Sequence, residues 1–204
     1  MRLSEFRGSI IFFFLITIVL LGCVSTKAQA PPNSPVKISP ASDKKTPFPV
    51  FELPIPQNDE QRNYLGISGS GKFEITQIKS PVIIIEVFSM YCPHCQSDAP
   101  LVNQLYLAIQ ARPDLKEKIK IIGIGITNGT YEVDLFRAKY KVLFPLFPDQ
   151  DMAISEKLGI TATPTFIGVK NNDDGTMEEF YFKSGEFHDV KSFLDEIIKL
   201  SKLG

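Results

Sequence analysis

The chain is poor in the residues that build disulfide frameworks, zinc sites and nucleic-acid surfaces. Its 204 residues include three cysteines, two histidines and no tryptophan. Three cysteines are too few for a disulfide-stapled scaffold, and there is no second cysteine pair to complete a zinc site. The net charge of −1 offers no basic surface to nucleic acid. With 44% hydrophobic residues, the composition instead predicts one globular domain with extensions.

The N-terminus has the pattern of an export signal. Residues 1–22 begin with basic side chains, continue through a twelve-residue apolar run at 10–21 and end on glycine. A helix needs about 20 apolar residues to span a bilayer, so this run is too short, but it suits a signal peptide. The segment "LLGC", which ends at Cys23, resembles the lipobox of bacterial lipoproteins. The resemblance implies that Cys23 carries a diacylglyceryl thioether and becomes the mature N-terminus. The alternative is an uncleaved anchor in which Cys23 is an apolar filler. Both interpretations place the rest of the chain outside the cytoplasm and tethered to a membrane.

The segment after Cys23 is predicted to be a spacer. Residues 23–49 are dominated by proline, serine, lysine and alanine and show no hydrophobic periodicity. Such a composition is typical of flexible linkers that are extended where proline is frequent. We therefore expect a lipidated cysteine with a proline-rich linker over 23–49 and a folded domain over 50–204.

Apolar runs separated by turn residues predict an α/β domain. The dense β-branched segments at 81–89 and 119–126 are typical of strands buried on both faces of a sheet. Further strands are expected at 50–55, 72–78, 163–169 and 178–185, a connecting or edge segment at 144–149, and helices at 99–112, 131–141, 152–159 and 188–203. This order predicts a central mixed β-sheet flanked by helices.

Two of the three cysteines, Cys92 and Cys95, lie where a predicted strand passes into a helix. A helix N-terminus presents free N–H groups and the positive end of the dipole, which stabilise a thiolate. We therefore expect Cys92 to be the exposed nucleophile and Cys95, one turn later, to be the buried resolving thiol. Pro93 suits the first turn because it has no N–H to lose. His94 can donate a hydrogen bond or a positive charge toward the Cys92 sulfur, which would make the disulfide more oxidising.

Other uses of a C-x-x-C pair fit less well. A structural disulfide would close only a very short loop and stabilise little. A c-type haem site is excluded because Gln96 stands where a histidine must follow Cys95. Metal binding lacks partners, since His94 and His188 are the only imidazoles. Redox chemistry is therefore the favoured interpretation, and a copper or other metal carrier that uses the two cysteines and a histidine remains the alternative from a different class.

The surroundings of the pair resemble a known family. "IIIEVFSMYCPHC" is similar to the active site of the thioredoxin superfamily, and its last residues resemble those of DsbA-type dithiol oxidases. The resemblance implies a thioredoxin-like fold and a buried acid six residues before the first cysteine, which is Glu86 in this sequence. A carboxylate in apolar surroundings can relay a proton to or from Cys95. The alternative is that Glu86 faces solvent.

"TATPTF" is the second landmark of this resemblance. It implies a cis-proline at Thr163–Pro164 that faces the cysteines and lets the Thr163 backbone pair with a substrate peptide. The alternative is an ordinary trans proline that begins a strand. Tyr91, immediately before Cys92, is expected either to form an apolar rim for a partner's cysteine or to belong to the core.

The spacing of the two landmarks resembles a membrane-tethered branch of the superfamily. Seventy-two residues separate Cys92 from Pro164, as in TlpA/ResA-like redoxins, and "CPHCQSDAP" resembles their C-x-x-C-x-x-E-x-P pattern with Asp98 in place of glutamate. We therefore expect an extracytoplasmic thiol–disulfide oxidoreductase that needs no dissociable cofactor, acts on protein thiols or disulfides and is recycled by a redox partner. A dedicated thiol reductase of cytochrome c maturation is the alternative within the same chemistry.

Overall fold

The computed structural model describes residues 46–203. The predicted signal peptide, Cys23 and the linker up to residue 45 lie outside the described residues. The elements in chain order are β1 (Thr46–Pro47), β2 (Glu52–Pro54), α1 (Asp59–Leu65), β3 (Lys72–Glu74), the 3₁₀ helix η1 (Ile75–Gln77), β4 (Val82–Phe88), α2 (Pro93–Gln110), β5 (Ile119–Ile126), α3 (Thr130–Tyr140), β6 (Leu146–Asp149), α4 (Ala153–Lys157), β7 (Thr165–Asn171), β8 (Met177–Ser184) and α5 (Val190–Ser201).

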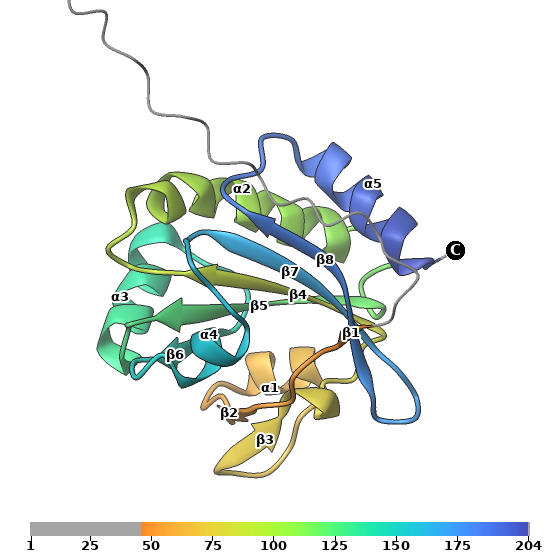
Figure 1. Ribbon diagram of the computed structural model, residues 1–204, viewed down its shortest axis with the longest axis horizontal. Helices are drawn as coiled ribbons and strands as arrows, with labels where there is room; N and C mark the ends of the chain where they lie inside the picture. Colours follow the sequence, from red (N-terminus) through yellow and green to blue (C-terminus); the bar gives the residue numbers. More distant parts are fainter. Residues whose placement is uncertain (1–45, 204) are drawn as a thin grey trace, which may run out of the picture. The chain divides into compact units, whose positions relative to one another are not determined.

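A six-stranded mixed sheet forms the centre of the domain (Figure 1). Its strand order is β1-β8-β7-β4-β5-β6, and a separate two-stranded sheet pairs β2 with β3. Strands β4, β5 and β6 run parallel, whereas β7 is antiparallel to both β4 and β8. The central strand β4 is buried along its whole length, as its unbroken apolar run predicts. The prediction of a central mixed sheet flanked by helices is confirmed.

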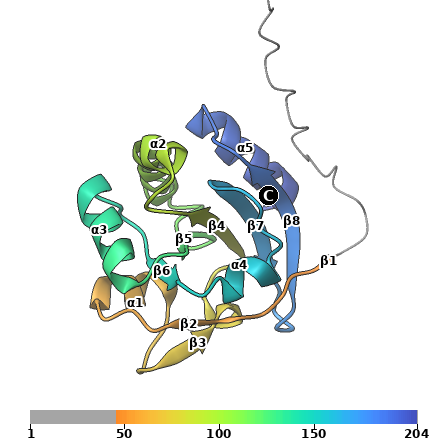
Figure 2. The same cartoon turned by 60° about the vertical axis from the view of Figure 1, so that its left-hand side comes forward.

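The two faces of the sheet carry separate hydrophobic clusters. Along β4, Ile84 and Phe88 point to the cluster that includes side chains of α2, α3 and α5, whereas Ile83, Ile85 and Val87 point to the cluster on the other face. In Figure 2, α2 and α5 lie on one side of the sheet and α1 with β2 and β3 on the other. Because side chains alternate along a strand, Glu86 shares the face of Ile84 and Phe88. It therefore lies on the α2 side.

Two glycines of β5 make room for an aromatic ring at the end of β4. A Cβ atom added at Gly123 would lie 3.2 Å from the Phe88 ring and 2.3 Å from a Leu146 methyl carbon. One added at Gly125 would lie 3.2 Å from the Phe88 ring. The glycines of "IKIIGIGI" thus let Phe88, the last residue of β4, pack over the neighbouring strand and against Phe136, at a ring separation of 4.5 Å.

The structure departs from the sequence-based expectations near the N-terminus. The fold already includes Thr46–Pro47 as strand β1 and a buried Phe48, so the predicted boundary at Val50 is too late. Helix α1 has no counterpart among the predicted elements. The predicted strand at 72–78 is a strand only as far as Glu74 and continues as η1. Within the described range 46–203, no helix is both long and apolar enough to cross a bilayer.

Leu105 and Leu107, two leucines of α2, offer a matched test of the core packing. Leu105 is fully buried, whereas Leu107 is 53% exposed. We expect Leu105→Ala to lower the free energy of unfolding by about 2–5 kcal/mol, because it leaves a cavity in the core. Leu107→Ala should change it by no more than about 0.5 kcal/mol. Urea unfolding of both variants measures this difference, and equal losses would show that α2 does not pack on the sheet through its Leu105 face.

Candidate active site

Cys92 and Cys95 sit at the point where β4 ends and α2 begins. Cys92 is the N-cap of α2 with an extended backbone, and Pro93 is the first helical residue. The Cys95 N–H donates to the Cys92 sulfur at 3.4 Å, as a capping side chain does at a helix start. Both cysteines are free thiols in this structure. The sequence places the pair correctly because a buried strand and an N-terminal proline define the junction from both sides.

The environment of Cys92 favours its thiolate. Cys92 is partly exposed, and its Sγ lies 3.3 Å from the carbonyl oxygen of Thr163. Burial raises the pKa of the thiol, but hydrogen bonds from the Thr163 side chain and from the backbone N–H groups of Cys95 and His94 outweigh this effect. The pKa of Cys92 therefore lies below its ordinary value. A lowered pKa increases the fraction of the nucleophilic form at neutral pH.

Cys95 has the opposite environment. Its side chain is fully buried. Burial raises the pKa of the Cys95 thiol far above its ordinary value, a hydrogen bond with the Ser89 backbone opposes this, and Cys92 and Glu86 raise the pKa further. The pKa values of two thiols one turn apart are thus shifted in opposite directions, and Cys95 needs a nearby base before it can act as a thiolate.

Glu86 is a buried carboxyl group on the same face of the sheet as Cys95. It is 1% exposed, so the solvent-facing alternative is wrong. Burial, and secondarily the charge of Asp98, raise the pKa of Glu86 to about 8. Its Oε1 atom has no hydrogen-bond partner. With a pKa of about 8 both forms of this carboxyl group are populated near neutral pH: the protonated form can give a proton to Cys95, and the ionised fraction can receive one from it.

Asp98 is a second buried acid, which the sequence-based prediction does not include in the site. It lies three residues after Cys95 on α2 and is 5% exposed, with Oδ2 unpartnered. Burial and the neighbouring Glu186 raise the pKa of Asp98 to about 6, whereas His188 and Lys183 lower it. The acidic position in "C-x-x-C-x-x-D" is the sequence signal that could have identified it.

The Thr163–Pro164 segment reaches the cysteines through strand pairing. Thr165 at the start of β7 pairs with Val87 near the end of β4, so the residues before Thr165 lie beside the residues after Val87. The Thr163–Pro164 peptide bond is cis, and the Thr165 hydroxyl donates to the carbonyl oxygen of Ala162 at 2.7 Å. The structure thus brings Thr163 and Cys92 together from positions 71 residues apart.

The loop before Cys92 is fixed by residues that the sequence gives no reason to select. The Met90 N–H donates to Oδ1 of the fully buried Asn128 at 2.7 Å. The Gln96 side chain donates to the Met90 carbonyl oxygen, also at 2.7 Å. Tyr91 then projects outward with 66% of its surface exposed, and its hydroxyl lies 3.4 Å from Glu132. Tyr91 is therefore not a core residue.

The His94 imidazole differs most from the expectation. Its Nδ1 lies 3.2 Å from Oε1 of Glu186, and 72% of the side chain is exposed. It is the backbone N–H of His94, not the ring, that acts on the Cys92 sulfur. Pro93 occupies its predicted place at the helix start. The tuning role predicted for His94 therefore has to operate through space or through Glu186.

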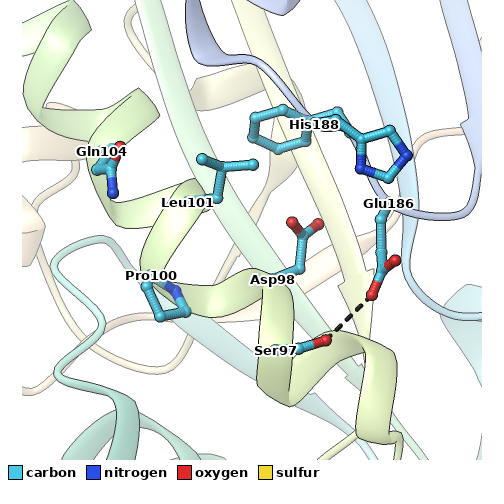
Figure 3. A pocket seen from close by; sticks show the side chains of 8 residues that line it. Ser97, Asp98, Pro100, Leu101, Gln104, Glu186 and His188 are labelled. Carbon is cyan, nitrogen blue, oxygen red and sulfur yellow. Dashed lines mark hydrogen bonds between the residues drawn. The ribbon is translucent and has the colours of Figure 1, made fainter.

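A pocket of about 420 Å³ opens beside the second and third turns of α2. It is lined by Ser97, Asp98, Pro100, Leu101, Gln104, Glu186, Phe187 and His188. Figure 3 shows the Asp98 and Glu186 side chains among the residues that line the pocket, with a hydrogen bond between Glu186 and Ser97. Across residues 46–203, no group of three or more histidine, cysteine, aspartate or glutamate side chains is arranged to hold a metal ion.

Known proteins with similar sequences are thiol–disulfide oxidoreductases. No family model matches the chain. The thiol-disulfide oxidoreductase ResA of Bacillus thuringiensis is 26% identical over 129 residues, which cover 63% of this chain and 68% of the relative. ResA of Bacillus anthracis is 24% identical over 127 residues, which cover 62% and 69%.

Solved structures show the same fold. A thiol:disulfide interchange protein of the thioredoxin family from Chlorobium tepidum superimposes with a TM-score of 0.56 at 20% identity, over 80% of this chain and 100% of that one. StoA from Bacillus subtilis gives a TM-score of 0.53 at 19% identity, over 78% and 98%. The fold is thioredoxin-like.

The raised pKa of Glu86 predicts a characteristic dependence of stability on pH. Between the ordinary carboxyl pKa near 4.5 and the folded value of about 8, the unfolded chain has released a proton that the folded protein retains. Stability must then fall as pH rises across this window, by at most about 1.4 kcal/mol per pH unit. We expect the free energy of unfolding of Glu86→Gln to decline less steeply with pH. Relative to the wild type, the variant should therefore become more stable as pH rises toward 8.

Unfolding free energies measured between pH 5 and 8 test this expectation. Glu60→Gln, which removes an exposed carboxylate from α1, is the matched control and should follow the wild-type curve. Asp98, whose pKa is also raised, contributes to the pH dependence of the unfolding free energy in the wild type and in both variants. Parallel curves for Glu86→Gln and the wild type would show that Glu86 is ionised when folded.

Proposed function

We propose that this chain, a ResA- and TlpA-like protein of the thioredoxin superfamily, exchanges disulfides with protein substrates through Cys92 and Cys95. It is a thiol–disulfide oxidoreductase. The observation that supports this assignment to the two cysteines is their asymmetry: Cys92 has a lowered pKa, and Cys95 a raised one. Disulfide exchange in two steps needs one thiol that is ionised and attacks first, and a second thiol that stays protonated until it resolves the mixed disulfide.

In the reducing direction, the Cys92 thiolate attacks one sulfur of a substrate disulfide. A Cys92–substrate mixed disulfide forms, and the other substrate sulfur leaves as a thiolate. Cys95 then gives its proton to Glu86 and attacks the Cys92 sulfur, which closes the Cys92–Cys95 disulfide and releases the second substrate thiolate. Two electrons have passed to the substrate. The oxidising direction is the reverse, and there Glu86 protonates the Cys95 thiolate as it leaves.

Thr163 and Tyr91 complete the proposed substrate site. Thr163 contacts the Cys92 sulfur through its carbonyl oxygen, and its backbone is placed to pair with an extended peptide as an added strand. Tyr91 offers an exposed ring next to Cys92, which suits contact with the residues around a substrate cysteine. No dissociable cofactor takes part, because the Cys92–Cys95 pair itself carries the two electrons as a dithiol and accepts them as a disulfide.

We place this chemistry outside the cytoplasm, on a membrane-attached lipoprotein. The support is the sequence pattern of residues 1–22 and the "LLGC" segment ending at Cys23. A proline-rich spacer over 24–45 would allow the domain to reach its substrates and a redox partner that recycles it. An oxidising compartment also suits a centre that must be disulfide-bonded for half of its cycle.

Replacing Cys95 by serine should trap the mixed disulfide. Cys92 can still attack, but no thiol remains to resolve the adduct. We expect Cys95→Ser to accumulate a covalent complex with a peptide or protein disulfide, seen on non-reducing gels and by mass. Cys92→Ser should form none. Equal amounts of adduct from both single variants would contradict the assignment of Cys92 as nucleophile and Cys95 as resolving thiol.

Replacing Cys23 by alanine should release the protein from membranes. The thioether requires the Cys23 sulfur, so the variant has no lipid and, at most, a short apolar run to hold it. We expect the wild type in the membrane fraction with the mass increase of a diacylglyceryl group. A membrane-bound Cys23→Ala variant would instead support an uncleaved anchor.

A further inference from the structure

We propose that Glu186 is a positioning residue of the redox centre, which holds the His94 imidazole beside α2 and offsets the positive charge of the imidazole in its protonated form. The inference rests on the proposed function and adds a control element to it. Its consequence is that the Cys92–Cys95 disulfide is less oxidising than its C-P-H-C sequence would make it with an unpaired histidine.

The contacts of the Glu186 carboxylate carry the first part of the inference. Oε1 lies 3.2 Å from His94 Nδ1 and 3.0 Å from the Ser97 hydroxyl. Both partners belong to the first turns of α2, and Figure 3 shows the Ser97 bond among the residues that line the pocket. These hydrogen bonds hold the pKa of Glu186 below its ordinary value, so the carboxylate stays charged at neutral pH.

The backbone of Glu186 is fixed independently of His94. The preceding Gly185 has φ 92°, a conformation that favours glycine, and its N–H donates to the Pro164 carbonyl oxygen at 2.8 Å. The following Phe187 is 2% exposed and stacks on Phe193 with ring centroids 4.4 Å apart. The contacts of Gly185 and Phe187, one on each side of Glu186, thus place Glu186 next to the start of α2. Neither contact involves His94.

The position of the imidazole sets its effect on the sulfur. An imidazolium near a thiolate stabilises the thiolate, which exists only in the reduced form, and so raises the reduction potential. In this structure the ring is bonded to a carboxylate, and in the described residues no hydrogen bond joins the imidazole to Cys92 Sγ. Paired charges present a weaker field to a third group than a lone charge does. Glu186 therefore weakens the stabilisation that His94 gives to the Cys92 thiolate.

The neighbours of Glu186 offer a second route by which Glu186 could affect the cysteines, and the test must distinguish it from the route through His94. Asp98, His188 and Lys183 also face this region, and Glu186 acts on the pKa of Asp98. A substitution of Glu186 could then reach the cysteines through Asp98 and Glu86 rather than through His94. A double-mutant cycle with His94 distinguishes the two routes, because only one of them requires the imidazole.

The test is the equilibrium of the purified protein with glutathione. Two glutathione thiols give two electrons to the Cys92–Cys95 disulfide, which yields the dithiol and one glutathione disulfide. Glu186→Gln keeps an acceptor oxygen for His94 and Ser97 but removes the charge. We expect it to shift the equilibrium constant toward the dithiol by about two- to fivefold, the range for a partly exposed ion pair, and to lower the pKa of Cys92 followed by thiolate absorbance.

Three further variants decide between the two routes. In a His94→Gln background the effect of Glu186→Gln should disappear, and Glu186→Asp, which keeps the charge, should restore most of the wild-type constant. Glu60→Gln on α1 controls for the change in net charge. An unchanged constant in Glu186→Gln, or an equal shift with and without His94, would overturn the inference while leaving the proposed function intact. A wild type that does not exchange with glutathione through Cys92 would instead contradict the proposed function and this inference together.

Discussion

The active site depends on the removal of Glu86 and Cys95 from water at the end of β4. A carboxyl group and a thiol are buried on the same face of the sheet, and in each case burial is the largest cause of the raised pKa. Ionisation of either group alone costs free energy because the charge is buried. A proton transfer from one group to the other is therefore favoured over the release of a proton to solvent. Cys92, a single turn away at the helix N-terminus, has solvent access and hydrogen-bond donors instead. The difference between the two thiols is therefore a difference in solvation, which the strand-to-helix junction creates.

The fold supplies this junction through pairing rather than through any single contact. Pairing of Val87 with Thr165 brings the Thr163–Pro164 segment to the cysteines. The two glycines of β5 leave room for the Phe88 ring to pack in the core at the end of β4. The loop between is held by Asn128. These groups come from three separate parts of the chain: the end of β4, strand β5 with the loop that follows it, and the start of β7. The sheet order, with β4 between β5 and β7, is what allows all of them to meet at one end.

The sequence predicts the parts of this arrangement that follow from local periodicity or from local chemistry. The buried strands β4 and β5, the amphipathic helix α5 and the junction at Cys92 all carry such a signal. Helix α1 carries almost none, since Leu65 is its only buried residue; the Asn58 cap and the αL Gly66 were its only markers. The burial of Asp98 and the approach of Glu186 to His94 depend on which elements pack together, and one-dimensional patterns do not contain that information.

The same limitation bears on how a redox dipeptide is interpreted. The identity of the two residues between the cysteines is commonly taken to set the oxidising power of the centre, on the assumption that their side chains act on the sulfur. In this fold the second of them, His94, lies against a carboxylate that follows β8, 92 positions along the chain. The electrostatic field at Cys92 then has three sources: the helix terminus, the backbone donors and an imidazole that is paired with a carboxylate. A four-residue motif specifies the first two of these. The third is specified only when the connection between β8 and α5 is known, because that connection decides whether the histidine acts alone.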